Sequence, residues 1–374
     1  MLGRMKSNAG FAILLILCAT PLFGQLEDAD AATQSKCREY FKTSLPPESA
    51  QAAKPEKWPE CYSYKSYSGL GTEVDYNAAR KCAWQERLAN QADLEPKYTL
   101  ASVFGGSAML ATLYANGEGV ERNIPLALRF ACEEGWAPAE FSARIEHLES
   151  MQGSTGEGAG KFSYCDDITS GAMEGYCAAY FRELADKDRT KTLSTISGRF
   201  TQAQRDAFSA LVQAEQAYAL AHGNGEIDLS GTARAMYQID AGQTLRDDFL
   251  AAVQSFESGR YPSGSPATFA AADARLNQAY EKAVAYTEAH KSDYRAVQLE
   301  GIRDAERAWL KYRDAWVAFA KLRYPAVPAE AWLTLLSQDR TSILDGSFCD
   351  MDAIANGDER CARQGDTYKP RPLP

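Results

Sequence analysis

The sequence has few of the residues on which metal and nucleophilic catalysis depend. It contains only three histidines, His147, His222 and His290, which lie far apart, and it has no C-x-x-C pair, so a zinc site is not expected. No phosphate-binding loop, G-x-S-x-G or H-E-x-x-H motif occurs, and no histidine has a matching Ser or Cys nucleophile pattern. The sequence therefore predicts no catalytic residue, no metal and no cofactor.

The chain also has fewer basic than acidic residues. The chain has 40 Lys and Arg against 50 Asp and Glu, which gives a net charge of −10. Arg4 and Lys6 are the only charged residues before Gly24, so residues 25–374 alone carry −12. Such a chain lacks the electrostatic footprint of a protein that binds nucleic acid or anionic lipid. A strongly basic protein partner is compatible with this charge.

Long apolar runs are missing except at the N-terminus. Residues 11–19 form an apolar run of about nine residues after two basic ones, which is too short to span a membrane and typical of a secretory signal. Cleavage is plausible after Gly24 or Ala31, and we take residues 1–24 as the signal peptide. We expect the mature protein to be soluble and exported, periplasmic or secreted, without stable membrane insertion.

The cysteines fit an exported chain. Besides Cys18 there are eight, and an even number in an exported protein indicates disulfides. Cys165 and Cys177 share one spacing with Cys349 and Cys361, and we expect both pairs to form short-loop disulfides. The other four cysteines are expected to pair within the N-terminal half, in an order that the sequence leaves open: Cys37, Cys61, Cys82 and Cys132.

No segment alternates apolar and polar residues over the length of a strand, whereas apolar residues recur at spacings of three and four. The sequence therefore predicts an all-α protein, with a short helical-hairpin repeat region followed by an antiparallel bundle, stapled by disulfides. The Gly/Ser-rich residues 151–162 have little to bury and are predicted to be a linker. The linker separates a repeat region at 25–150 from a helical domain at 163–348, and a Cys- and Pro-containing tail follows at 349–374.

Residues 106–132 have the pattern of a helical hairpin. Gly117 and Gly119 follow an apolar helix face and allow a tight turn, because glycine reaches positive φ without steric cost. Pro125 then opens a second helix, and a weaker copy of the pattern lies at 67–83. The two segments resemble the Sel-one-like repeat, a relative of the tetratricopeptide repeat, and the resemblance implies stacked hairpins over roughly residues 60–148.

After the linker, apolar residues form a regular stripe along 302–319, and a second stripe runs along 276–286. A final helix is expected to start near Pro328. Residues 208–218 align with 299–309 at a constant offset of 91, which indicates an internal duplication. An antiparallel bundle buries such stripes most simply. The polar face of the 302–319 helix is predicted to carry Arg303, Glu306, Arg307, Lys311 and Asp314.

Three pieces of this region, taken in order, resemble the N-terminal domain of the LprI-type lysozyme inhibitors. The resemblance covers about residues 163–348 and is strongest over 270–345. Glu306 occupies the usual Gln position, and Trp316-Val317 stand where the family commonly has a cysteine, so Cys349 must pair elsewhere. Cys165 to Cys177 resembles the family's opening helix. The matching motif residues are Asp273, Leu276, Asn277, Tyr280, Trp309, Tyr312, Arg313, Asp314, Leu335, Arg340 and Leu344.

These motif residues are expected to be mainly structural. Trp309 and Tyr312 belong to the apolar stripe, while Arg313 and Asp314 are expected to pair with neighbouring helices or to face solvent. Asp273 is interpreted as a helix N-cap or first-turn acid, and Asn277 as a hydrogen-bonding contact to a neighbouring helix.

The resemblance implies a non-enzymatic binding protein of the cell envelope whose partner is a basic lysozyme or another envelope protein. The alternative is an interaction scaffold or a toxin-immunity protein that acts through the helical repeats. A third hypothesis is an enzyme that acts on cell-wall polymers through a carboxylate pair such as Asp166-Asp167 or Asp247-Asp248.

Overall fold

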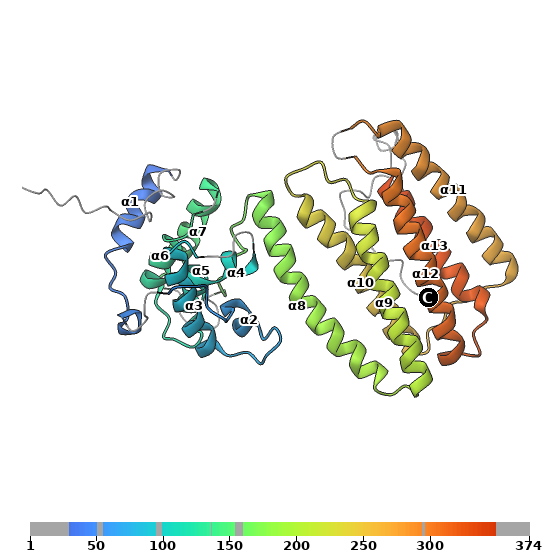
Figure 1. Ribbon diagram of the computed structural model, residues 1–374, viewed down its shortest axis with the longest axis horizontal. Coiled ribbons are helices and arrows are strands. Elements are labelled where there is room, and N and C mark those ends of the chain that lie inside the picture. Colours follow the sequence, from blue (N-terminus) through green and yellow to red (C-terminus); the bar gives the residue numbers. More distant parts are fainter. Residues whose placement is uncertain are drawn as a thin grey trace, which may run out of the picture.

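The computed structural model describes residues 30–50, 55–94, 99–135, 137–153, 160–293 and 296–348 (Figure 1). Within these ranges the regular secondary structure is helical, and no strand is present. The all-α prediction is therefore confirmed. The predicted signal peptide and the cysteines Cys349 and Cys361 lie outside the described residues.

The N-terminal half consists of short helices, among which are the two hairpins expected from the sequence. Gly69 and Gly117 end the first helix of each hairpin with φ of 66° and 69°, a conformation that glycine adopts without strain. The hairpins stack because α3 packs against α5. The helices are α1 (Ala31–Tyr40), η2 (Pro47–Ala50), α2 (Ser63–Ser68), α3 (Tyr76–Gln91), α4 (Leu100–Phe104), α5 (Gly106–Asn116), α6 (Ile124–Ala131) and α7 (Pro138–Ser150).

Disulfides and one buried acid hold these short helices together. Cys37 of α1 is bonded to Cys132 at the end of α6, and Cys61 before α2 is bonded to Cys82 of α3. The buried carboxylate of Glu86 accepts hydrogen bonds from the backbone N–H groups of Ser63 (3.1 Å) and Gly106 (3.0 Å), which begin α2 and α5. One side chain of α3 therefore caps two helices at once.

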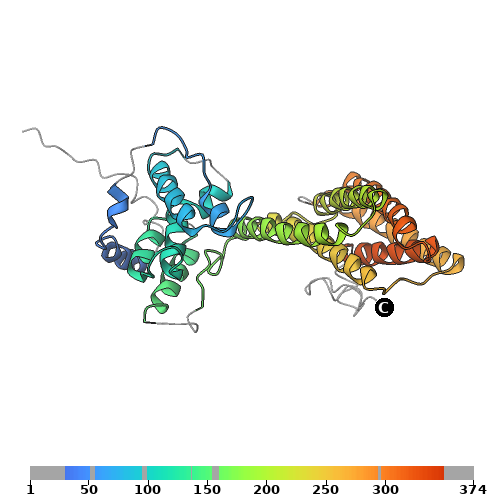
Figure 2. The same cartoon turned by 90° about the horizontal axis from the view of Figure 1, so that it is seen from below.

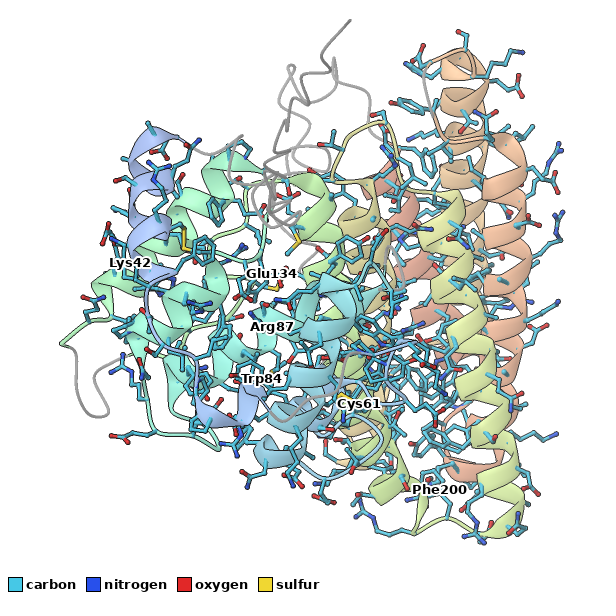
Figure 3. All side chains as sticks on the ribbon, turned by 60° about the vertical axis from the view of Figure 1, so that its left-hand side comes forward. Lys42, Cys61, Trp84, Arg87, Glu134 and Phe200 are labelled. Carbon is cyan, nitrogen blue, oxygen red and sulfur yellow. A yellow bond between two sulfur atoms is a disulfide. The ribbon has the colours of Figure 1, made fainter. Side chains whose placement is uncertain are left out.

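A second buried charge lies at the next residue of α3. Arg87 is paired with Glu133, and its guanidinium lies over the ring of Trp84 at 5.5 Å (Figure 3). Both ionic side chains are almost inaccessible to solvent. The pair fixes α3 against the segment that follows α6.

The C-terminal half is a bundle of long helices. They are α8 (Gly171–Ser197), α9 (Gln202–Gly225), α10 (Arg234–Glu257), α11 (Pro266–His290), α12 (Leu299–Arg323) and α13 (Ala329–Ser347). The last of them follows Pro328, as the sequence predicted. None of the described helices is both long enough and apolar enough to cross a membrane.

Helix α8 belongs to both halves (Figure 2). Its first turns carry Met173 and Cys177 into the N-terminal core, and Cys177 is bonded to Cys165. Its last turns carry Leu193 and Ile196 into the core of the bundle. Phe162 and Tyr164 also pack in the N-terminal core. The transition from the N-terminal core to the core of the bundle therefore occurs along α8. The domain boundary at 151–162 stays a prediction.

The bundle core is built around α9 and α12, which run antiparallel. Where the end of α9 meets the start of α12, a Cβ on Gly225 would lie 2.5 Å from the carbonyl oxygen of Gly301, so the two backbones are in direct contact. Further along the pair, Phe208 packs on Phe319 with ring centroids 5.1 Å apart. Trp316 stacks on Trp332 of α13 at 6.0 Å. The two helices are therefore in backbone contact at the glycine end, and aromatic rings fill the space between them at the other end.

Candidate functional site

A buried ionic cluster lies at the centre of the segment that carries the sequence motif. Arg340 of α13 is fully buried and donates two hydrogen bonds to Glu226, of 2.8 and 2.6 Å. It also donates two to Glu306 of α12, of 3.1 and 3.0 Å, and one to the hydroxyl of Tyr218, of 3.2 Å. His222 completes the cluster through a 2.8 Å contact between its Nδ1 and Glu226. The cluster thus joins α9, α12 and α13.

The charges in this cluster are set by their neighbours. Burial alone would raise the pKa of Glu226, but the guanidinium of Arg340 lowers it to about 2. Burial raises the pKa of Glu306, and Arg340 only partly offsets that effect. Such an arrangement is inaccessible to a protein partner. Its physical role is to specify how three helices meet.

The position of Glu306 differs from the one expected from the sequence. The sequence pattern placed it on the polar face of α12, whereas only 19% of its side chain is exposed and it bonds Arg340. It lies at the edge of the buried stripe, one residue after Ala305, which is fully buried. The available signal was the arginine near the end of the motif, because a buried arginine needs a carboxylate partner.

The aromatic and aliphatic motif residues lie in the core. Leu276 and Trp309 are buried, and Tyr280 and Tyr312 pack against the same core from partly buried positions. Tyr312 stacks on Tyr218 with ring centroids 5.7 Å apart.

The polar motif residues lie at the surface and pair locally. Arg313 donates two hydrogen bonds to the adjacent Asp314 and its guanidinium lies 5.5 Å from the ring centre of Trp309. Asn277 contacts Asp273 of its own helix at 3.4 Å, so it does not reach a neighbouring helix. Helix α11 is capped by Ser265, eight residues before Asp273, and no acid lies in its first turn, so the interpretation of Asp273 as an N-cap or first-turn acid is wrong.

A polar groove runs along the outer side of α11 and α13, with a volume of about 450 Å³. Arg275 and Lys282 line it from α11, and Gln338 and Thr341 line it from α13. Within the described part of the chain, neither Arg275 nor Lys282 forms a hydrogen bond or an ion pair through its side chain. The groove therefore presents two cations together with the carboxylate of Asp345.

The carboxylate pairs considered for catalysis are engaged in separate contacts. Asp167 lies 3.0 Å from His147, and Asp166 accepts a hydrogen bond from the backbone of Ser163. Asp247 is paired with Arg189. Among the residues that the structure describes, no group of three or more His, Cys, Asp or Glu side chains is arranged to hold a metal ion.

Asp248 is the exception among these acids. Burial raises its pKa to about 7, and the nearby charges of Asp339 and Asp247 add to the effect. It lies on α10, close enough to Asp339 of α13 for the two carboxyls to interact electrostatically.

A protein-family model described as "Lysozyme inhibitor LprI" matches residues 265–344. These residues span α11 and α12 and most of α13, where the motif residues, Arg340 and the groove lie. The match falls on the part of the chain where the sequence resemblance is strongest, and the resemblance of residues 163–264 and the Sel-one-like repeats stay predictions. No curated protein and no solved structure matches the chain.

Proposed function

We propose that this chain is an exported, non-enzymatic binding protein of the cell envelope that inhibits a lysozyme. The observation that carries the proposal is the match of a lysozyme-inhibitor family to α11–α13, the helices that Arg340 and the motif aromatics hold together. The three disulfides support it, because such bonds persist in extracellular and envelope compartments.

The net charge of the chain also supports a basic lysozyme as the partner. The chain carries −10 overall, and a basic muramidase would be attracted to it over a distance of about one Debye length. Complementary charge of this kind mainly raises the association rate and the specificity. We infer that this inhibition weakens as salt rises.

The test is a cell-wall lysis assay in which the purified protein is titrated against a basic lysozyme at low and at high salt. Inhibition at micromolar protein that weakens at high salt supports the proposal. Absence of inhibition of any muramidase at either salt contradicts it.

A second candidate, an envelope scaffold or immunity protein, is favoured by one surface. Tyr62 and Phe181 are each nearly half exposed and are linked through a chain of ring contacts by Tyr64 and Tyr180. This pair of exposed rings lies where α2 meets α8. Capture of a protein partner that is lost in the Tyr62→Ser/Phe181→Ser variant, with lysis inhibition unchanged or absent, would favour this candidate.

A further inference from the structure

A short irregular segment of the N-terminal half packs on the hairpins without belonging to either of them. Residues 41–50 follow α1, and their regular structure is a single 3₁₀ turn, η2. The carbonyls of Phe41 and Thr43 accept hydrogen bonds from Arg129 of α6. Leu45 packs against the N-terminal core from a partly buried position. We call residues 41–50 the strap.

The strap places one carboxylate on hydrogen-bond donors from both hairpins. Oε1 of Glu48 accepts a hydrogen bond from Nε1 of Trp84 in α3 (3.0 Å) and one from the hydroxyl of Tyr114 in α5 (3.1 Å). Burial and the charge of Glu48 raise the pKa of Tyr114, so its hydroxyl keeps the proton that it donates. The ring of Phe130 in α6 packs on both donor rings, with centroids 5.4 and 5.8 Å apart. The hairpins themselves therefore hold the donors in place.

The carboxylate of Glu48 fills this site incompletely. Its second oxygen, Oε2, lies 3.6 Å from Nε of Arg80, which is too far for a hydrogen bond. That Nε is buried and has no hydrogen-bond partner among the described residues. A buried donor without a partner is costly, so a carboxylate that also reached Arg80 would fit better than Glu48 does. The site is open to solvent, because 32% of the Glu48 side chain is exposed.

The residues around Glu48 are suited to binding in one conformation. Pro46 and Pro47 have a fixed φ, which lowers the conformational entropy lost when the segment is held against a surface. Leu45 and Glu48, on either side of the prolines, make an apolar and an acidic contact with the hairpins. The strap thus defines a pattern: an apolar residue, two prolines and a glutamate.

Two disulfides keep the strap near the site whether or not Glu48 occupies it. The bond between Cys37 and Cys132 fixes the chain before the strap, and the bond between Cys61 and Cys82 fixes it afterwards. A segment that is tied at both ends competes with a free ligand at a high effective concentration. Displacement of the strap is therefore reversible.

We propose that the strap is a built-in occupant of a site that binds an acidic, proline-containing segment of a protein partner. Arg80, Trp84 and Tyr114 form the site, and the partner's glutamate displaces Glu48. The donors select for a carboxylate, because a segment without one would leave them unpaired. No residue of this site belongs to α11–α13, so the site is separate from the proposed inhibition of lysozyme.

The test uses the full chain and a fluorescently labelled peptide with the strap's own sequence, Ser-Leu-Pro-Pro-Glu-Ser, with its Gln-for-Glu analogue as the uncharged control. Glu48→Ala is expected to bind the peptide at least tenfold more tightly than wild type, as follows if the strap occupies the site in about nine molecules of ten. The analogue is expected to bind this variant at least tenfold more weakly than the acidic peptide. Adding Arg80→Gln to Glu48→Ala is expected to reverse the gain.

The matched control is Glu60→Ala, which removes an exposed acid between the same two disulfides that pairs with Lys57 at the surface. Circular dichroism shows whether each variant is folded. Glu48→Gln keeps the size of the side chain and is expected to give a smaller gain in the same direction, so it decides the question if Glu48→Ala does not fold.

Three results would overturn the proposal: no tighter binding of the acidic peptide by the folded Glu48 variants, an equal gain in Glu60→Ala, or a gain that persists when Arg80→Gln is added. Lysis inhibition is measured separately on the same variants and is expected to be unchanged. Failure of this proposal is therefore distinguishable from failure of the proposed function.

Discussion

The two halves of the molecule reach stability by different means. The N-terminal half uses α-helices as short as 5 residues and no longer than 16, and it contains all three disulfides of the described residues. In the bundle the helices have 19 to 27 residues, and the core is made of aromatic rings and the Arg340 cluster. Short helices are marginal by themselves because nucleation is costly. Disulfides therefore stabilise the N-terminal half, whereas long packed helix interfaces stabilise the bundle.

Buried charge differs between the halves in the same way. Glu86 is buried without an ion-pair partner, so burial raises its pKa, and the hydrogen bonds from N–H groups at two helix starts offset that rise only in part. Arg340 is satisfied by two carboxylates from other helices. The first device caps short helices, and the second fixes how long ones cross.

The largest effect is expected from removing the ionic centre of the bundle. Arg340→Met leaves Glu226 and Glu306 buried without their cation, which costs roughly 3–5 kcal/mol of the free energy of unfolding. Urea unfolding followed by circular dichroism measures it. The matched control is Arg313→Met, an arginine of α12 paired at the surface with Asp314, for which at most about 1 kcal/mol is expected. Equal losses in the two variants would contradict the structural role assigned to Arg340.

In the N-terminal half, the largest effect is expected from removing the disulfide that closes the longest loop. Cys37→Ser/Cys132→Ser opens a loop with a sequence separation of 95 and is expected to cost roughly 2–5 kcal/mol. Cys165→Ser/Cys177→Ser, with a separation of 12, is expected to cost less because closing a short loop removes less entropy from the unfolded chain. Thermal unfolding of both variants measures the difference. A greater loss from the short-loop variant would show that strain or packing, not chain entropy, dominates.

Helix contact in the bundle is tested by adding a single methyl group. Gly225→Ala places a Cβ against the backbone of Gly301, so α9 and α12 must separate, at an expected cost of about 1–3 kcal/mol. Gly346→Ala is the control, because a Cβ there meets nothing within 4 Å. Chemical unfolding should show a lower midpoint for the first variant only. An unchanged midpoint for Gly225→Ala would mean that the two backbones are not in contact.

The stability of the bundle is also expected to depend on pH. Burial raises the pKa of Glu215 and Asp248 to about 7, so the folded state holds protons that the unfolded state releases near pH 4. Their contribution to stability is therefore full below about pH 4 and is lost as pH rises towards 7. Glu226, with its pKa lowered to about 2, has the opposite sign, and its contribution is lost as pH falls from 4.5 towards 2.

The check is the free energy of unfolding measured at intervals from pH 4 to pH 8. Asp248→Asn should reduce the decline over this range, because the amide does not titrate. A decline of the same size in wild type and variant would assign the pH dependence to other groups.

The sequence by itself was enough to predict the helical class, the turn glycines of the hairpins and the start of α13. These features depend on local chemistry: the period of apolar residues, positive φ at Gly117, and the fixed φ of Pro328. The match of the inhibitor family to 265–344 likewise falls on motif residues that the sequence displays in order.

Only the tertiary structure decided which side chains meet. The pairing of Cys37 with Cys132 and the assembly of Arg340 with Glu226 join residues about a hundred positions apart, and helical periodicity carries no information about such contacts. Glu306 was placed on the polar face because its neighbours on that face are charged, yet α13 approaches there and withdraws it from water. The groove lined by α11 and α13 likewise exists only because these two helices lie side by side.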